Sequence, residues 1–205
     1  MPRRSSPGSS KEAPQLPLVF DPSSLVPCGD KPEVEKEAIR AAGDLVLRVG
    51  AIIYLSRRML RVYRTKVLPL LREHHPLPRL QAGLVRTVDR LIRSQTRCRL
   101  LPLRGHEELQ YALRPGSCAS LHVLERSRVE RYDVSGLGLR DEEDMEVLRV
   151  ALAAASKEHE VLLVSVDRHF LEDLRVHELR ARYPDEGERT RIMRPSELIV
   201  ELQGI

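Results

Sequence analysis

The sequence contains no tryptophan, and its aromatic residues are limited to five tyrosines and two phenylalanines among 205 residues. Modules that bind single-stranded nucleic acid through RRM or OB folds stack bases on exposed aromatic side chains. The shortage of aromatic residues therefore disfavours both kinds of module.

Cysteine is also scarce. The chain has Cys28, Cys98 and Cys118, and no two of them form a C-x-x-C pair. Three isolated cysteines cannot by themselves complete a tetrahedral zinc site, and they do not form a disulfide framework. We interpret them as buried thiols, because free cysteine is usually buried.

Long apolar runs are missing as well. No stretch approaches the roughly 18 consecutive apolar residues that a membrane-spanning helix needs. Residues 1–10 carry charge but are not followed by the apolar region of a secretory signal. From these two absences we expect a soluble, cytoplasmic protein.

Common nucleotide-binding motifs are absent too. There is no G-x-x-x-x-G-K-[ST] loop, and the Gly136-Leu137-Gly138 sequence lacks the third glycine and the preceding strand of a dinucleotide site. The Asp-Pro-Ser sequence at 21–23 also lacks the second aspartate expected of a haloacid-dehalogenase-like phosphatase.

Charge is present in excess, and its distribution is uneven. The chain has a net charge of +4, but residues 48–104 contain fourteen arginines and lysines against only two acidic residues, Glu73 and Asp89. The remainder of 18–205 is correspondingly acidic. This polarity suits a protein that holds a polyanion on one surface and gathers cations at another. The alternative interpretation is that the arginines solvate the outer faces of helices.

Apolar patterning predicts strands alternating with helices. Helical spacing predicts a helix that ends before Gly50, a second after Ser56, which is placed to cap it, a third over 80–92 and a fourth over 141–155. Residues 181–189 are predicted to form a loop, and 195–197 to begin a helical turn. The stretch 98–137 is ambiguous: 107–113 suits a helix, and 121–124 suits a strand or a helix. The predicted strands are apolar throughout and lie at 16–20, 51–55, 161–166 and 190–193.

Apolar strands separated by helices indicate a parallel sheet covered on both faces. We therefore predict an α/β domain over 18–205, preceded by a flexible, basic, Pro/Ser-rich arm over 1–17. Right-handed crossovers place the carboxyl ends of all parallel strands along one edge of the sheet, where ligands bind.

Three aspartates are predicted to meet at this edge. Asp21 follows the first strand, Asp167 follows the 161–166 strand, and Asp144 lies at the start of the helix that leads into the second of these strands. Carboxylates gathered in this way repel one another unless a cation lies between them. Oxygen ligands favour Mg²⁺ or Mn²⁺, and such an ion can promote hydrolysis of a phosphodiester. By contrast, we interpret His169 as a surface residue, and each aspartate taken singly is also compatible with a loop or helix cap.

Several segments together resemble the PIN-domain nuclease family. VFDPSSLV at 19–26 resembles the opening strand of that family, in which the aspartate is followed two residues later by Ser or Asn, here Ser23. The segment at 51–68 is similar to the family's second strand and following helix, and 141–155 with 161–170 resembles its later acidic helix and strand. Residues 192–202 resemble its closing strand and helix. The resemblance covers roughly 19–72 and 138–202, with 73–137 carried only by general shape.

The resemblance implies a PIN-like three-layer sandwich with a central parallel sheet of four to five strands. It also implies a Mg²⁺- or Mn²⁺-dependent endoribonuclease of the VapC-like toxin or RNA-processing kind, with an antitoxin or other protein as partner and a homodimer as a common assembly. Asp21, Asp144 and Asp167 would be its catalytic residues and metal ligands, with Ser23 and Asp141 as accessory candidates.

One departure from the family pattern weakens this prediction. The family usually has a metal-site glutamate on the helix after the second strand, whereas this chain has no acidic residue between Asp44 and Glu73. Val62 is the best match to the missing position, and Arg61 is the alternative. The second hypothesis is therefore a catalytically weakened PIN domain that binds RNA or a protein. In either case, RNA affinity is predicted to come from the arginines of 79–99 and from Arg57, Arg58, Arg61, Arg64 and Lys66.

Overall fold

The computed structural model describes residues 16–27, 29, 31–73, 80–84, 86, 109–112 and 119–204. Most of the predicted basic arm, the three cysteines, residues 85 and 87–92 of the predicted helix at 80–92, and all but Arg86 of the arginines at 79–99 lie outside the described residues. Residues 16 and 17, predicted to close the arm, already belong to the first strand. Among the described residues, no helix has the length and apolar character needed to cross a membrane.

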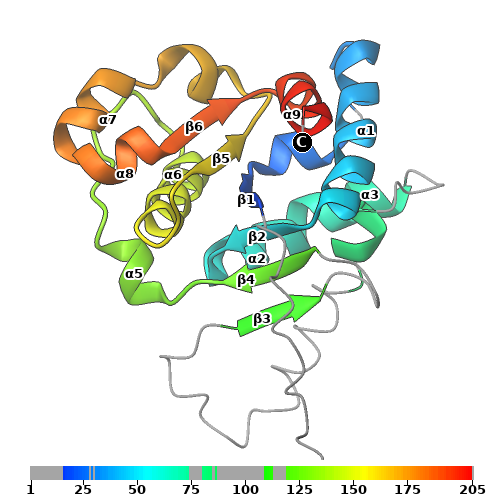
Figure 1. Cartoon of the computed structure of the whole chain (residues 1–205), viewed down its shortest axis with the longest axis horizontal. Coiled ribbons are helices and arrows are strands. Elements are labelled where there is room, and N and C mark those ends of the chain that lie inside the picture. The colour runs from blue at the N-terminus through cyan, green and yellow to red at the C-terminus, as the bar shows by residue number, and fades with distance from the viewer. Residues whose placement is uncertain are drawn as a thin grey trace, which may run out of the picture.

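The described part of the chain forms a six-stranded sheet (Figure 1). The strand order is β3-β4-β2-β1-β5-β6, and the five strands from β4 to β6 are parallel. This confirms the predicted parallel α/β sheet, to which β3 adds an antiparallel edge beside β4. The strands are β1 (Leu16–Phe20), β2 (Ala51–Leu55), β3 (Leu109–Ala112), β4 (Ser120–Val123), β5 (Val161–Val164) and β6 (Thr190–Met193).

Helices cover both faces of the sheet. In Figure 1, α1 and α9 pack together on one side, and α6 lies on the other side against β1, β2 and β5. The helical segments are η1 (Pro22–Leu25), α1 (Glu33–Val49), α2 (Arg57–Val62), η2 (Tyr63–Val67), α3 (Leu68–Glu73), α5 (Arg126–Glu130), α6 (Glu142–Ala155), η4 (His169–Asp173), α7 (Val176–Arg182), α8 (Pro184–Arg189) and α9 (Pro195–Gln203).

Two local predictions were wrong. The predicted loop at 181–189 contains the end of α7 and all of α8. Pro184 at the first turn and Asp185 and Glu186 beside it suit a helix start. Gly187 packs closely on α7, where an added Cβ would lie 3.1 Å from the Arg180 Cα. The segment at 107–113 contains β3 instead of a helix, because pairing with β4 satisfies its backbone groups.

The strand order creates a switch point beside β1. From β1 the chain proceeds to β2 and β4 on one side of the sheet, and then returns through α6 to β5 and β6 on the other side. The carboxyl ends of β1 and β5 are therefore adjacent while their connections diverge. In open parallel sheets such a point is where ligands bind.

Candidate metal centre

Asp21 is the first residue after β1 and is buried at the switch point. Its backbone N–H donates to the Val164 carbonyl at the end of β5 (3.0 Å), and only 4% of the residue is exposed. The hydroxyls of Ser23 and Ser165 both donate to its Oδ2 atom, the latter at 2.9 Å. Burial raises the pKa of Asp21 to about 7 from its ordinary 3.8; the two hydroxyls oppose this rise, and the charges of Asp144 and Asp167 add to it.

Asp167 lies three residues beyond the end of β5, in a turn that its own side chain organises. Its Oδ1 atom accepts the backbone N–H of His169 at 2.8 Å, and its backbone N–H donates to the Ser165 hydroxyl at 2.9 Å. Its carbonyl accepts the N–H groups of Phe170 and Leu171, and Phe170 is anchored in the core with 2% exposure. The turn therefore presents Asp167 and His169 together from a fixed backbone.

Asp144 completes the cluster from the first turn of α6. Asp144 is 8% exposed, and its Oδ2 atom lies 2.9 Å from the Nδ1 atom of His169. The same imidazole nitrogen lies 3.5 Å from Asp167 Oδ1. Burial raises the pKa of Asp144, the hydrogen bond with His169 lowers it, and the charges of Asp167 and Asp141 raise it further. The hydrogen bond to Asp144 in turn raises the pKa of His169.

One ligand atom from each of Asp144, Asp167 and His169 lies within 4.8 Å of the others. Two carboxylates and an imidazole are a common donor set for a divalent transition metal, and a cation would offset the repulsion among the acidic groups. The chemistry of the donor set thus fits a metal ion. Asp21 is joined to the cluster by Ser165, whose hydroxyl donates to Asp21 and accepts the Asp167 N–H.

The cluster differs from the predicted aspartate triad by one residue. Asp144 and Asp167 lie together as expected, and His169 joins them although we interpreted it as a surface residue. Asp21 lies outside this group and is linked to it through the Ser165 hydroxyl. The sequence signal for including His169 is its position two residues after Asp167, because a side-chain-capped turn after a strand brings residues i and i+2 together. That signal is weak without knowledge of where Asp144 lies.

The two accessory candidates have different surroundings. Ser23 contacts the site directly, through its hydrogen bond to Asp21. Asp141 instead caps α6, with its Oδ1 atom accepting the Glu143 N–H at 2.7 Å. The capping bond gives Asp141 a structural role at the start of the helix that carries Asp144.

The helix after β2 places a tyrosine near Asp21. Tyr63 is 1% exposed, and its hydroxyl donates to the Phe20 carbonyl at 2.6 Å. Burial raises the pKa of Tyr63, and the charge of Asp21 adds to that rise. Val62 is partly buried and Arg61 is exposed. Tyr63 is thus the residue of this helix whose polar group reaches the carboxyl end of β1.

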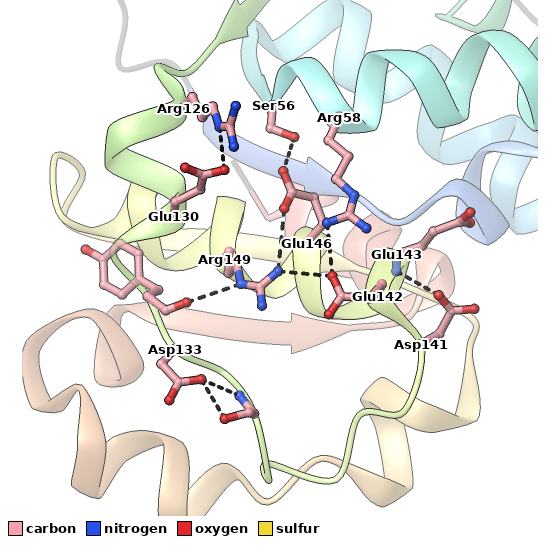
Figure 2. Close-up of polar contacts among 12 residues, drawn as sticks. Ser56, Arg58, Arg126, Glu130, Asp133, Asp141, Glu142, Glu143, Glu146 and Arg149 are labelled. Carbon is pink, nitrogen blue, oxygen red and sulfur yellow. Dashed lines mark hydrogen bonds and ion pairs between the residues drawn. The ribbon is translucent and has the colours of Figure 1, made fainter.

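Polar contacts hold this helix against α6 (Figure 2). Ser56 caps α2 by accepting the Met59 N–H at 3.0 Å, and its hydroxyl donates to Oε1 of the buried Glu146 at 2.5 Å. Arg149 Nη1 lies 3.7 Å from Glu146 Oε2 and 3.6 Å from Glu142 Oε2. The predicted cap at Ser56 is confirmed, and it also links α2 to the helix that carries Asp144.

The five basic residues predicted at 57–66 to bind RNA are exposed along α2 and η2, and of the arginines at 79–99 the structure describes only Arg86, which is also exposed. Two of them contact the acidic first turn of α6: Arg58 Nη1 lies 2.9 Å from Glu142 Oε2, and Lys66 Nζ lies 2.6 Å from Glu143 Oε1. The first pair is exposed and the second is partly exposed, so each contributes little to stability and its cation can exchange to another anion. Among the described residues, Arg57, Arg61 and Arg64 form no ion pair.

No protein-family model, no curated protein and no solved structure matches the chain significantly.

Proposed function

We propose that this protein is a PIN-like, metal-dependent endoribonuclease that hydrolyses phosphodiester bonds of RNA. The observation that carries the proposal is the cluster of Asp144, Asp167 and His169 beside Asp21 at the switch point of the parallel sheet. Acidic groups gathered at such an edge suit a divalent cation, and divalent cations suit phosphoryl chemistry.

Asp144 and Asp167 would hold the metal, with His169 and Asp21 completing its surroundings. A bound divalent cation would activate a water molecule and offset negative charge on the phosphate. Both serine hydroxyls bond to Oδ2 of Asp21, so we assign its Oδ1 atom to metal ligation or to accepting a proton. A carboxyl group whose pKa is about 7 is suited to accept a proton near neutral pH.

RNA is the proposed substrate because basic residues flank the site. Arg57, Arg61 and Arg64 are exposed on the helix that follows β2, and they belong to the strongly basic segment of the sequence. Such side chains contact phosphates without reading sequence. The acidic cluster would then lie beside a surface that retains the polyanion.

A second function is favoured by Tyr63. In the family that the sequence resembles, the helix after the second strand carries a metal-site glutamate. In this chain that helix instead presents Tyr63, whose hydroxyl donates to the Phe20 carbonyl at the end of β1. With one carboxylate fewer, the chain would bind RNA while cutting it slowly or not at all. This is the catalytically weakened module considered above.

The experiment is cleavage of labelled RNA with Mg²⁺ or Mn²⁺ by the wild type, Asp144→Asn and Asp167→Asn. Asp185→Asn is the matched control, because Asp185 is exposed on α8. The nuclease predicts metal-dependent cleavage that both cluster variants lose and the control keeps. Salt-dependent binding without cleavage supports the weakened module, and the absence of both binding and cleavage overturns both functions.

A further inference from the structure

A cavity of about 470 Å³ is lined by residues of η1, which follows Asp21 in the chain, and of the η2–α3 helix. Its walls include Ser23 and Val26 on one side and Val67 and Leu70 on the other. Small-molecule sites usually occupy about 300–1,000 Å³. The cavity is therefore large enough for a ligand and lies outside the metal-site cluster.

The lining combines apolar walls with positive charge. Val26 and Val67 are buried, whereas Leu70 remains 42% exposed, which makes it one of the few large apolar side chains open to solvent among the described residues. Lys31 and Lys66 add positive charge to the lining, and the Lys66 ammonium also forms the partly exposed ion pair with Glu143. A ligand that fits this combination has a flat or apolar body and carries negative charge beside it.

Ser23 connects the cavity to the candidate metal centre. It lines the cavity and donates its hydroxyl hydrogen to Asp21. A molecule that reached the metal cluster with one group could therefore place a neighbouring group in the cavity. This shared residue makes one ligand that spans the metal centre and the cavity the occupant that we consider.

We propose that the cavity binds an unpaired nucleobase of the RNA strand whose phosphate lies at the metal centre. This inference rests on the proposed function and assigns a subsite to it. A nucleobase is flat and apolar on its faces, and the phosphates that flank it complement Lys31 and Lys66. A base stacked within a duplex cannot enter such a cavity, so the occupant must be unpaired.

The test measures binding of labelled pentaribonucleotides in Mn²⁺ at low temperature, with gel analysis to check that they stay intact during the measurement. One oligonucleotide has all of its bases, and the others carry a single abasic site that is moved from position to position. For the wild type, we expect removal of one particular base to weaken binding about tenfold, because the buried apolar contact is lost. Equal affinity for all of the oligonucleotides overturns the proposal, whatever the variants do.

Three variants locate the effect. Leu70→Asp should abolish the preference for the intact oligonucleotide, whereas Val200→Asp should keep it, because Val200 is 70% exposed on α9, away from the cavity. Lys66→Gln should weaken binding of intact and abasic oligonucleotides by the same factor, because it removes a phosphate contact and not a base contact. A folded Leu70→Asp protein that keeps the full preference overturns the proposal.

The subsite and the nuclease can fail separately. Metal-dependent cleavage with no base preference removes the subsite and leaves the proposed function. A base preference that depends on Leu70, in a protein that cuts no RNA, keeps the subsite and removes the nuclease.

Discussion

The hydroxyl of Ser165 donates a 2.9 Å hydrogen bond to Oδ2 of Asp21, although the two residues are 144 positions apart. Ser165 is fully buried, and the same oxygen accepts the Asp167 N–H at 2.9 Å. One hydroxyl thus ties the end of β1 to the turn after β5.

Ser165→Ala should destabilise the fold by about 1–3 kcal/mol, because a buried donor and acceptor are lost together. The loss should be larger at pH 8 than at pH 5, since the bond to Asp21 is stronger when that carboxyl is charged. Denaturant unfolding at both pH values measures it. Ser127→Ala, at an exposed position, is the control and should change stability by less than about 0.5 kcal/mol.

The pKa of Asp21 predicts a specific dependence of stability on pH. Because the pKa is about 7 in the folded protein against an ordinary 3.8, folding favours the protonated carboxyl. Its stabilising contribution is complete below pH 3.8 and is lost as the pH rises through about 7. The full span corresponds to a free energy on the order of 4 kcal/mol.

Asp21→Asn should remove this dependence, since the amide does not titrate. In EDTA, the variant should therefore gain stability relative to the wild type as the pH rises from 4 to 8. Denaturant unfolding across this range provides the comparison. A constant difference between the two proteins would show that the carboxyl is not titrating as we expect.

His169 should make the metal centre selective among divalent cations. Imidazole nitrogen favours transition metals over Mg²⁺, which prefers oxygen ligands. His169→Ala should therefore weaken Mn²⁺ binding by at least about tenfold and affect Mg²⁺ much less. Calorimetric titration measures both affinities, with His159→Ala as the control at an exposed site. Unchanged Mn²⁺ affinity in His169→Ala would exclude the imidazole as a ligand.

Gly138 is required where its loop meets the end of η4. Its φ is +97°, and a Cβ there would lie 2.1 Å from the Asp173 carbonyl oxygen. Gly136 has a φ of +75° but open space around a Cβ. Gly136→Ala should cost about 1 kcal/mol from backbone strain, and Gly138→Ala clearly more, because the backbone must also move. Thermal unfolding of the two variants compares them, and equal losses would contradict the steric argument.

The salt dependence of RNA binding tests the basic surface. Arg61→Gln and Arg64→Gln should each reduce the slope of log affinity against log salt by about one unit, because one phosphate contact is lost. Arg175→Gln, an exposed substitution near α7, should leave the slope unchanged. If all three slopes equal that of the wild type, the arginines of α2 and η2 only solvate the helix.

Local sequence patterns were sufficient for much of the fold. The observed bounds of β1, β2 and β6 match the predicted strands, and Ser56 caps α2 as expected. These features depend on neighbouring residues: an apolar run suits a buried strand, and a serine before a helix can bond to its first turn. The same patterns place Asp21 and Asp167 after strands and Asp144 at a helix start, without indicating which residues each of them contacts.

Only the tertiary structure decided which side chains Asp21, Asp144 and Asp167 contact. Adjacency of β1 and β5 brings Ser165 to Asp21, and packing of α6 on those strands brings Asp144 to His169. Packing likewise places Tyr63 near Asp21, and pairing with β4 makes a strand of 109–112. Periodicity reports that a residue is buried but not against which element. That choice depends on contacts between segments far apart in the sequence, which no local pattern contains.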